Sequence, residues 1–140
     1  MAALTAERRL RRETWTRKSF TLTGVKAQKG GMAAYDQSAG KVTKVQTGAT
    51  FNDLFILGTF HETVDATSAD KAVIVDLKRE VNIVWMANDG TNPVTVNDIG
   101  KSIYGVDDQT VSISSATSTR SVVGVAWAVD STLGVAVEMT

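Results

Sequence analysis

From Ser19 to the C-terminus, short apolar segments alternate with turn residues, and this alternation limits the possible folds more than any other feature. Segments of this length, separated by Gly, Asn and Asp, are typical of a β-sandwich or a β-barrel. The chain contains 18 Val, 18 Thr and 6 Ile, 42 β-branched residues in 140, which fit a pleated strand better than a helix. We therefore predict an all-β fold, a compact antiparallel β-sandwich or barrel of a jelly-roll-like kind, as one domain over residues 19–140.

We expect strands at the apolar segments and turns between them. The expected strands are Phe20–Thr23, Met32–Asp36, Lys41–Gln46, Leu54–Phe60, Ala72–Leu77, Val81–Met86, Val94–Val96, Ile103–Val106, Thr110–Ser114, Val122–Val129 and Leu133–Val137. The run Asn-Asp-Gly-Thr-Asn-Pro at 88–93 is the clearest hairpin signal. Residues 122–129 are almost continuously apolar, as in the centre of a sandwich or an oligomer interface. Residues 114–121 predict a polar loop that is mobile or contacts a partner, and we find no internal repeat.

The two signs of charge are segregated along the chain. Residues 1–29 carry eight basic and two acidic side chains, a net charge of +6, whereas residues 30–140 carry seven basic and thirteen acidic ones, a net charge of −6. Residues 1–18 also lack apolar periodicity. We predict that they form an extended basic arm, and that this arm contacts an acidic surface.

Several classes of site lack the residues that they need. The chain has no Cys, so it cannot form a disulfide or a thiolate metal site, and His61 is its only histidine. A Ser-His-Asp site would depend on His61 alone, and no G-x-S-x-G elbow is present, so we favour a strand-edge role for this residue. No segment approaches the ~18 apolar residues of a membrane span, and arginines occupy the place of a signal peptide's apolar segment. We predict a protein that is not an enzyme, binds no cofactor and contacts no membrane.

Two weaker patterns have a simpler explanation as turns. Gly100-Lys101-Ser102 looks like the end of a phosphate-binding loop, but that motif needs Gly at position 95, where this chain has Thr, and a helix afterwards. Acidic and amide side chains cluster in the turns around it, without the twelve-residue loop and terminal Glu of a calcium site. Asp and Asn are common in turns because they bond their own backbone. We therefore expect no metal.

The basic arm is the candidate binding segment. Its predicted partner-binding residues are Arg8, Arg9, Arg11, Arg12, Trp15, Arg17 and Lys18. They can pair with carboxylates of a protein partner while Trp15 fills a pocket, or neutralise phosphates and stack on a base, or form a solvated tail. We favour the protein partner, because an acidic body would repel extended nucleic acid.

The run Asp98–Val111, which reads D-I-G-K-S-I-Y-G-V-D-D-Q-T-V, precedes a last strand that reads G-V-A-V at 134–137. This succession resembles a signature of the cement proteins of tailed-bacteriophage heads, in which D-I-G-K-x-x-Y-x-V-D-D-Q-T-V precedes G-V-x-V. Shorter matches to the family occur elsewhere in the chain, in the order in which the family has them. They lie at residues 1–6, 11–12, 29–33, 39–40, 63–65, 75–80, 87–88 and 129–130. The chain departs from the family in the density of Arg in its arm and in Gly105, where an apolar β residue is frequent.

The resemblance implies a structural virion protein on the outer surface of a phage head. Such a protein would bind the major capsid protein without catalysis or cofactor, and cement neighbouring capsid subunits. Members of this family are compact β domains that oligomerise, and for this chain we favour a dimer over a trimer. The alternative is a nucleic-acid-binding β-barrel with an Arg-rich arm.

Overall fold

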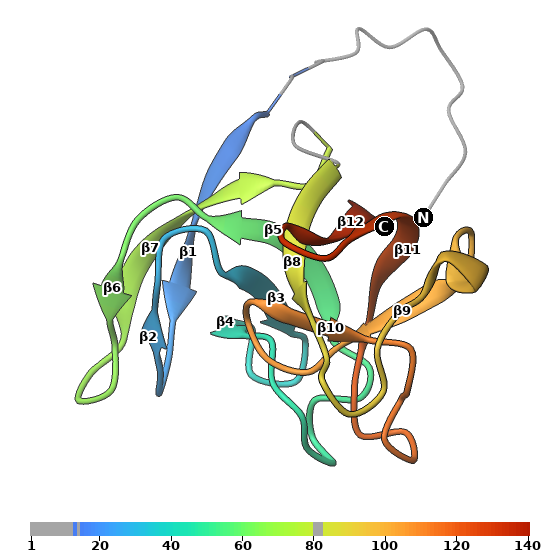
Figure 1. Cartoon of the computed structure of the whole chain (residues 1–140). Coiled ribbons are helices and arrows are strands. Elements are labelled where there is room, and N and C mark those ends of the chain that lie inside the picture. Colours follow the sequence, from blue (N-terminus) through green and yellow to red (C-terminus); the bar gives the residue numbers. More distant parts are fainter. Residues whose placement is uncertain (1–12, 14, 80–82) are drawn as a thin grey trace, which may run out of the picture.

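A computed structural model describes residues 13, 15–79 and 83–140 of the chain. These residues form two β-barrels, which lie side by side in Figure 1, and a small two-stranded sheet. The one helical element within the described ranges is the 3-10 helix η1, Val96–Asp98. The predicted all-β fold is thus confirmed, and its strands close into two barrels.

The first barrel is closed in the order β1-β4-β3-β5-β7. Its strands are β1 Arg17–Leu22, β3 Met32–Asp36, β4 Lys41–Lys44, β5 Phe55–Phe60 and β7 Lys71–Leu77. The two-residue strands β2 (Lys26–Ala27) and β6 (Val64–Asp65) pair beside it. Because β1 begins at Arg17 and pairs with β7 along its whole length, Arg17 and Lys18 belong to the barrel rather than to the arm.

The second barrel is closed in the order β10-β8-β12-β11-β9. Its strands are β8 Ile83–Asn88, β9 Ser102–Gly105, β10 Thr110–Ser112, β11 Val122–Asp130 and β12 Gly134–Met139. In chain order, both barrels follow one plan: the first and third strands are parallel neighbours, and every other neighbouring pair is antiparallel.

The registers of the two barrels also coincide. The parallel pair Leu22–Val42 of the first barrel corresponds to Asn88–Val111 of the second. In their pairing with β3 and β9, the bulged strands β5 and β11 each leave one residue unpaired, Leu57 and Val123, beside a Gly. We call residues at the same register position of the two barrels equivalent. The structure therefore contains one five-stranded plan twice, although the sequence shows no internal repeat.

Glycines mark two equivalent positions where the backbone requires them. Gly30 and Gly100 both have positive φ, +86° and +88°, and their N–H groups donate to the carbonyls of the equivalent residues Phe60 and Ala126. Gly58 and Gly124 lie where a Cβ atom would be 2.0 Å from a carbonyl oxygen of the last strand of the same barrel. The two barrels therefore share their tightest backbone contacts as well as their registers.

Two apolar clusters fill the molecule. The first lies inside the first barrel and includes Phe60, Val73 and Val75. The second lies inside the second barrel and also takes in four buried residues of the first-barrel half of the chain: Met32, Ala34, Val45 and Ile56. Since side chains alternate along a strand, β3 contributes Ala33 to one cluster and Met32 and Ala34 to the other. The outer face of β3 and β5 thus closes the second barrel, and the two barrels form one packed unit.

The polar loop at 114–121 reinforces this contact. The Gly48 N–H donates to the carbonyl of Thr119 (2.8 Å), and Arg120 Nε donates to Thr47 Oγ1 (3.1 Å). The Ser121 hydroxyl accepts from the Leu54 N–H and donates to the Phe51 carbonyl. The partner of this loop is therefore the first half of the same chain.

The strand expected at Val94–Val96 was wrong, and so was the hairpin at 88–93. The Asn88 side chain donates to the Val94 carbonyl and accepts from the Val94 N–H, both at 2.8 Å, which takes the place of strand pairing. Asp98 then accepts from the Thr95 N–H (2.9 Å), as in a helix N-terminal cap. The chain forms η1 there instead of returning along β8.

We expect Gly58→Ala and Gly124→Ala each to lower the free energy of unfolding by about 3 kcal/mol, because the added methyl group would force a backbone carbonyl to move. Chemical denaturation monitored by circular dichroism measures this. The control is Gly90→Ala, where a Cβ meets nothing within 4 Å, and where we expect a change within about 0.5 kcal/mol. Unchanged stability of both test variants would contradict the equivalent close contacts.

Candidate protein-interaction surfaces

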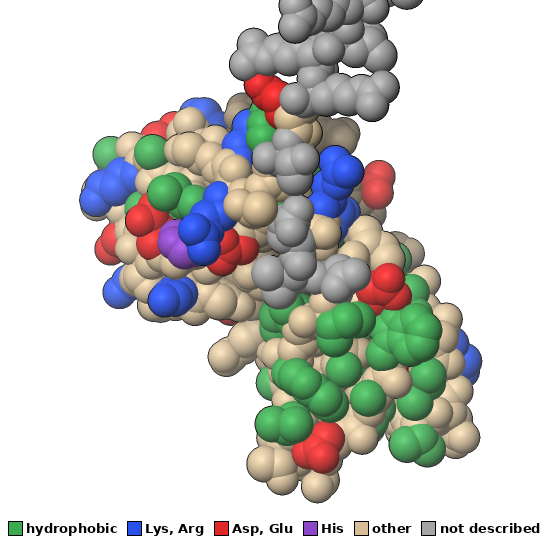
Figure 2. All heavy atoms as spheres, turned by 90° about the horizontal axis from the view of Figure 1, so that it is seen from above, with side chains coloured by type: hydrophobic (Ala, Val, Ile, Leu, Met, Phe, Trp, Pro, Cys, Tyr) green, Lys and Arg blue, Asp and Glu red, His purple; other side chains and the backbone are tan. Residues whose placement is uncertain are grey.

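The outer face of β8, β12 and β11 exposes large apolar side chains. On β8, Ile83 and Trp85 point outward and are 47% and 44% exposed, while the intervening Val84 packs on the core. Trp127, in the bulge of β11, is 56% exposed, and its Nε1 donates to Glu138 of β12. We call Ile83, Trp85, Val125, Trp127, Ala136 and Glu138 the tryptophan face. In Figure 2, hydrophobic side chains gather over one part of the molecule, which is the second barrel.

The equivalent face of the first barrel is largely polar. By the shared registers, the residues equivalent to Ile83, Trp85 and Val125 are Arg17, Ser19 and Thr59. His61 follows Phe60 as Trp127 follows the equivalent Ala126, so we treat these two residues as equivalent too. In Figure 2, the histidine lies among acidic and basic side chains over the other barrel. Two positions keep their character: the acidic one, Asp76 in the first barrel and Glu138 in the second, and an apolar one, Ile74 and Ala136.

A cluster of three side chains holds this polar face together. Arg17 Nε donates to Asp76 Oδ1 at 2.7 Å, and His61 Nδ1 lies 3.2 Å from Asp76 Oδ2. Partial burial raises the pKa of Asp76, but the hydrogen bonds from Arg17 and His61 outweigh it and hold that pKa below its ordinary value. His61, directly after β5, therefore has a carboxylate partner in the same face.

The difference between the two outer faces shows which side chains barrel closure does not require. A barrel of this plan closes with Arg, Ser, Thr and His on its outer face, so closure does not require the exposed Ile, Trp and Val of the second barrel. Adjacent exposed apolar side chains on one face are typical of a surface that another molecule covers, and Trp is enriched where proteins bind each other. The tryptophan face is therefore a candidate protein-interaction surface.

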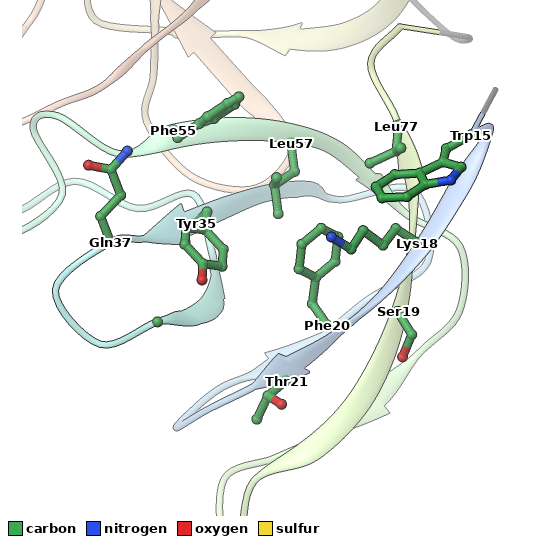
Figure 3. Close-up of a pocket in the computed structure, with 11 residues that line it drawn as sticks. Trp15, Lys18, Ser19, Phe20, Thr21, Tyr35, Gln37, Phe55, Leu57 and Leu77 are labelled. Carbon is green, nitrogen blue, oxygen red and sulfur yellow. The ribbon is translucent and has the colours of Figure 1, made fainter. Parts of the chain in front are cut away.

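A second candidate surface is an aromatic pocket of about 570 Å³ at one end of the first barrel. Its wall is formed by Trp15, Phe20, Tyr35, Phe55, Leu57 and Leu77, and Figure 3 shows these side chains around a common space. Lys18 extends across it, with Nζ 4.8 Å from the Trp15 ring centroid and 5.3 Å from that of Phe20. Lys78 Nζ lies 4.4 Å from the Phe55 ring centroid. We call this site the basic aromatic pocket.

The equivalent end of the second barrel is closed. Met86, Val123 and Met139, the equivalents of Phe20, Leu57 and Leu77, are buried in the second cluster. Gly105 is equivalent to Tyr35, and a Cβ there would be 2.3 Å from Val45 Cγ1. The first-barrel half of the chain therefore fills the end of the second barrel, while the corresponding end of the first barrel remains open.

The structure distributes the predicted partner-binding residues over different environments. Trp15 and Lys18 line the basic aromatic pocket, whereas Arg17 points to the polar face and pairs with Asp76. Trp15 is 50% exposed, and its Nε1 donates to Glu13. The predicted residues Arg8, Arg9, Arg11 and Arg12 lie outside the described residues.

Most residues of both surfaces were not among the predicted site residues. The available signal was the presence of Trp at outward positions of two expected strands, 81–86 and 122–129. Segment 122–129 had been considered as an oligomer interface, and its outward side does contribute Val125 and Trp127 to the tryptophan face. The pocket had no comparable signal, since its walls come from four separate strands.

The other sequence patterns are structural. Lys101 Nζ lies 3.1 Å from Asp98 Oδ1 and strand β9 begins at Ser102, so Gly100-Lys101 is a turn that leads into a strand. Within residues 13, 15–79 and 83–140, no group of three or more His, Cys, Asp and Glu side chains could hold a metal ion. No helix in the same part of the chain is long and apolar enough to cross a membrane.

Comparisons of this chain with family models, with curated proteins and with solved structures found no match.

We expect the stability of the protein to fall as the pH drops below about 4, the ordinary pKa of an unfolded Asp. Six other carboxyls share the lowered pKa of Asp76, those of Asp36, Asp65, Asp70, Asp89, Asp98 and Asp130. A carboxyl whose folded pKa is lowered adds stability above its unfolded pKa, and this is lost as the pH falls through the folded pKa. Urea denaturation at several pH values measures the effect.

Asp76→Asn should reduce this acid dependence and cost up to about 1 kcal/mol at pH 7, because its ion pair is partly exposed. Asp53→Asn is the control, since Asp53 is exposed and has no hydrogen-bond partner within the described ranges. An acid dependence equal for wild type and Asp76→Asn would contradict the role given to the Arg17–Asp76–His61 cluster.

Proposed function

We propose that this protein is a structural component of a virion, which binds the outer surface of a tailed-bacteriophage head and cements neighbouring major capsid protein subunits. The tryptophan face carries the protein-binding part of this proposal. It is an apolar surface that barrel closure does not require, on a scaffold whose equivalent face is polar. The resemblance of residues 98–111 and 134–137 to head cement proteins supplies the identity of the assembly.

The mechanism we propose is multivalent clamping. One copy joins two barrels through a shared apolar core, so that a force on one surface is transmitted to the other. Each contact can then be modest, because linked contacts raise the effective affinity well above that of any single one. Added interface between neighbouring subunits raises the barrier to their separation without changing the fold of the shell protein.

The N-terminal segment is the proposed contact with the capsid. The chain enters β1 beside Trp15 and Lys18 at the basic aromatic pocket, so the arginines at 8, 9, 11 and 12 precede this pocket by a few residues. Arg forks make paired hydrogen bonds with carboxylates, which a Lys ammonium cannot. Arg17 is already paired with Asp76, so we assign the contact with an acidic patch of the capsid to the four preceding arginines.

Nucleic-acid binding by an Arg-rich arm is the alternative function, and the same variants test it. The second barrel offers little to a polyanion: residues 83–140 contain two basic and six acidic side chains, a net charge of −4. Retention of the protein on duplex DNA with a steep salt dependence, in the absence of binding to heads, would favour this alternative.

Deletion of residues 2–12 should leave the β-structure intact, because β1 begins at Arg17, and should weaken binding to purified heads. Exposed ion pairs contribute about 0–1 kcal/mol each, so the loss of four arginines should lower the affinity roughly tenfold or more at low salt. Rising salt should weaken the full chain more than the deleted chain. Cosedimentation with heads at several salt concentrations measures both effects.

The matched control replaces Arg8, Arg9, Arg11 and Arg12 with Lys, which keeps the charge but removes the guanidinium forks. We expect it to bind heads with intermediate affinity. Equal affinity of the full and deleted chains at low salt would show that the arm is a solvated tail. Failure of the full chain to bind heads would overturn the proposed function.

A further inference from the structure

The second barrel of the same chain shows what kind of surface closes a barrel end of this plan. The equivalent end of the second barrel is covered by an outer barrel face, with Met32 and Ala34 of β3 and Ile56 of β5 buried against its core. A barrel of this plan thus receives apolar side chains from the outer face of another barrel. The basic aromatic pocket presents the same kind of end without that cover.

The tryptophan face is an outer barrel face with exposed apolar side chains, as such a cover requires. It projects Trp85, Trp127 and Ile83, each between 44% and 56% exposed. An aromatic side chain that enters a well-packed pocket is a frequent energetic centre of a protein interface. The pocket offers Trp15, Phe20, Tyr35 and Phe55 as its wall, and all its lining residues come from the first-barrel half of the chain. Because the pocket and the tryptophan face lie on different barrels of one packed unit, a contact between them needs two copies.

The charges of the two surfaces are also complementary. Residues 17–79 contain nine basic and six acidic side chains, a net charge of +3, against −4 for residues 83–140. The ammonium groups of Lys18 and Lys78 lie over aromatic rings of the pocket, and neither forms an ion pair within the described residues. On the opposing surface, Glu138 is the carboxylate of the tryptophan face. Partial burial lowers the pKa of Lys78, so a carboxylate brought close to it would offset that cost.

We propose that the tryptophan face of one copy covers the basic aromatic pocket of a second copy. Trp85 and Trp127 then contact the aromatic wall, and Glu138 approaches Lys18 and Lys78. If each copy gives its face and receives the other's, the two contacts close a twofold dimer. This inference deepens the proposed function, on which its use in a phage head rests, and identifies the contact by which one copy is linked to the next.

Sedimentation velocity of the isolated full-length protein, over a range of concentrations and without heads, tests self-association. The face variant is Trp85→Ser with Trp127→His, which installs the residues that the first barrel carries at the equivalent positions. The pocket variant is Phe55→Ser with Lys78→Glu, where Ser is the equivalent residue of the second barrel, Ser121. We expect each to raise the dissociation constant by ~100-fold or more, with unchanged circular dichroism.

Mixing the two variants is the decisive experiment. A face variant keeps an intact pocket and a pocket variant keeps an intact face, so the mixture should form a heterodimer although each variant alone is monomeric. The control, Thr59→Ala on the polar face of the first barrel, should associate like the wild type. Glu138→Lys should weaken association by itself, and Glu138→Lys with Lys78→Glu in the same chain should recover part of it, because every contact then regains opposite charges.

Three outcomes would overturn the inference: a wild-type protein that stays monomeric at high concentration, association that neither variant weakens, or a mixture that stays monomeric. Association that only the face variant weakens would point to contact between two tryptophan faces and would overturn the inference as well. The results also separate this inference from the proposed function. Heads that bind a monomeric protein would overturn the inference alone, and self-association without head binding would overturn the proposed function alone.

Discussion

The insertion of the outer face of β3 and β5 into the core of the second barrel is the contact on which the rest of the molecule depends. It buries Met32, Ala34, Val45 and Ile56, and so gives β3 two buried faces. Interiors of proteins are close-packed, and a fixed interface of this kind transmits strain instead of absorbing it. The contact therefore makes two small barrels, each limited in the surface that it can bury alone, into one packed unit. It covers one end of the second barrel, whereas the equivalent end of the first barrel stays open.

The duplicated plan allows the requirements of folding and of binding to be separated within one chain. Equivalent positions that keep their character are those inside the barrel or in close backbone contact: Val42 and Val111, Val73 and Val135, Val75 and Val137, Gly58 and Gly124, Gly30 and Gly100. Equivalent positions on the outer face diverge, as with Ser19 and Trp85 or His61 and Trp127. Since both sets of side chains accompany the same backbone plan, the plan itself does not dictate the residues of the outer face.

The sequence predicted the strands well where the apolar segment was long, because alternation is a local property of the chain. It missed β2 and β6, which have two residues each, and it overpredicted Val94–Val96, where a single side chain, Asn88, replaces the strand pairing. The internal repeat escaped because loops of different length change the separation of equivalent residues. It is 62 residues from Asp76 to Glu138 and 70 from Ala33 to Ile103. The basic aromatic pocket was also out of reach, since non-local pairing alone brings Phe20, Tyr35 and Phe55 together.

The asymmetry between two equivalent ends explains why the surfaces of this chain differ in kind. An end that is filled from outside can carry small residues, and the second barrel has Gly105 and Ser121 there, with Val45 occupying the free space. An end without an intramolecular cover must reduce its own exposure, and the first barrel places Tyr35 and Phe55 at the same two positions. Phe55 nevertheless remains 43% exposed, so its own residues close this end only in part. The small side chains at the closed end thus follow from a cover that lies within the chain, and the large, partly exposed ones at the open end are where we propose that a second copy binds.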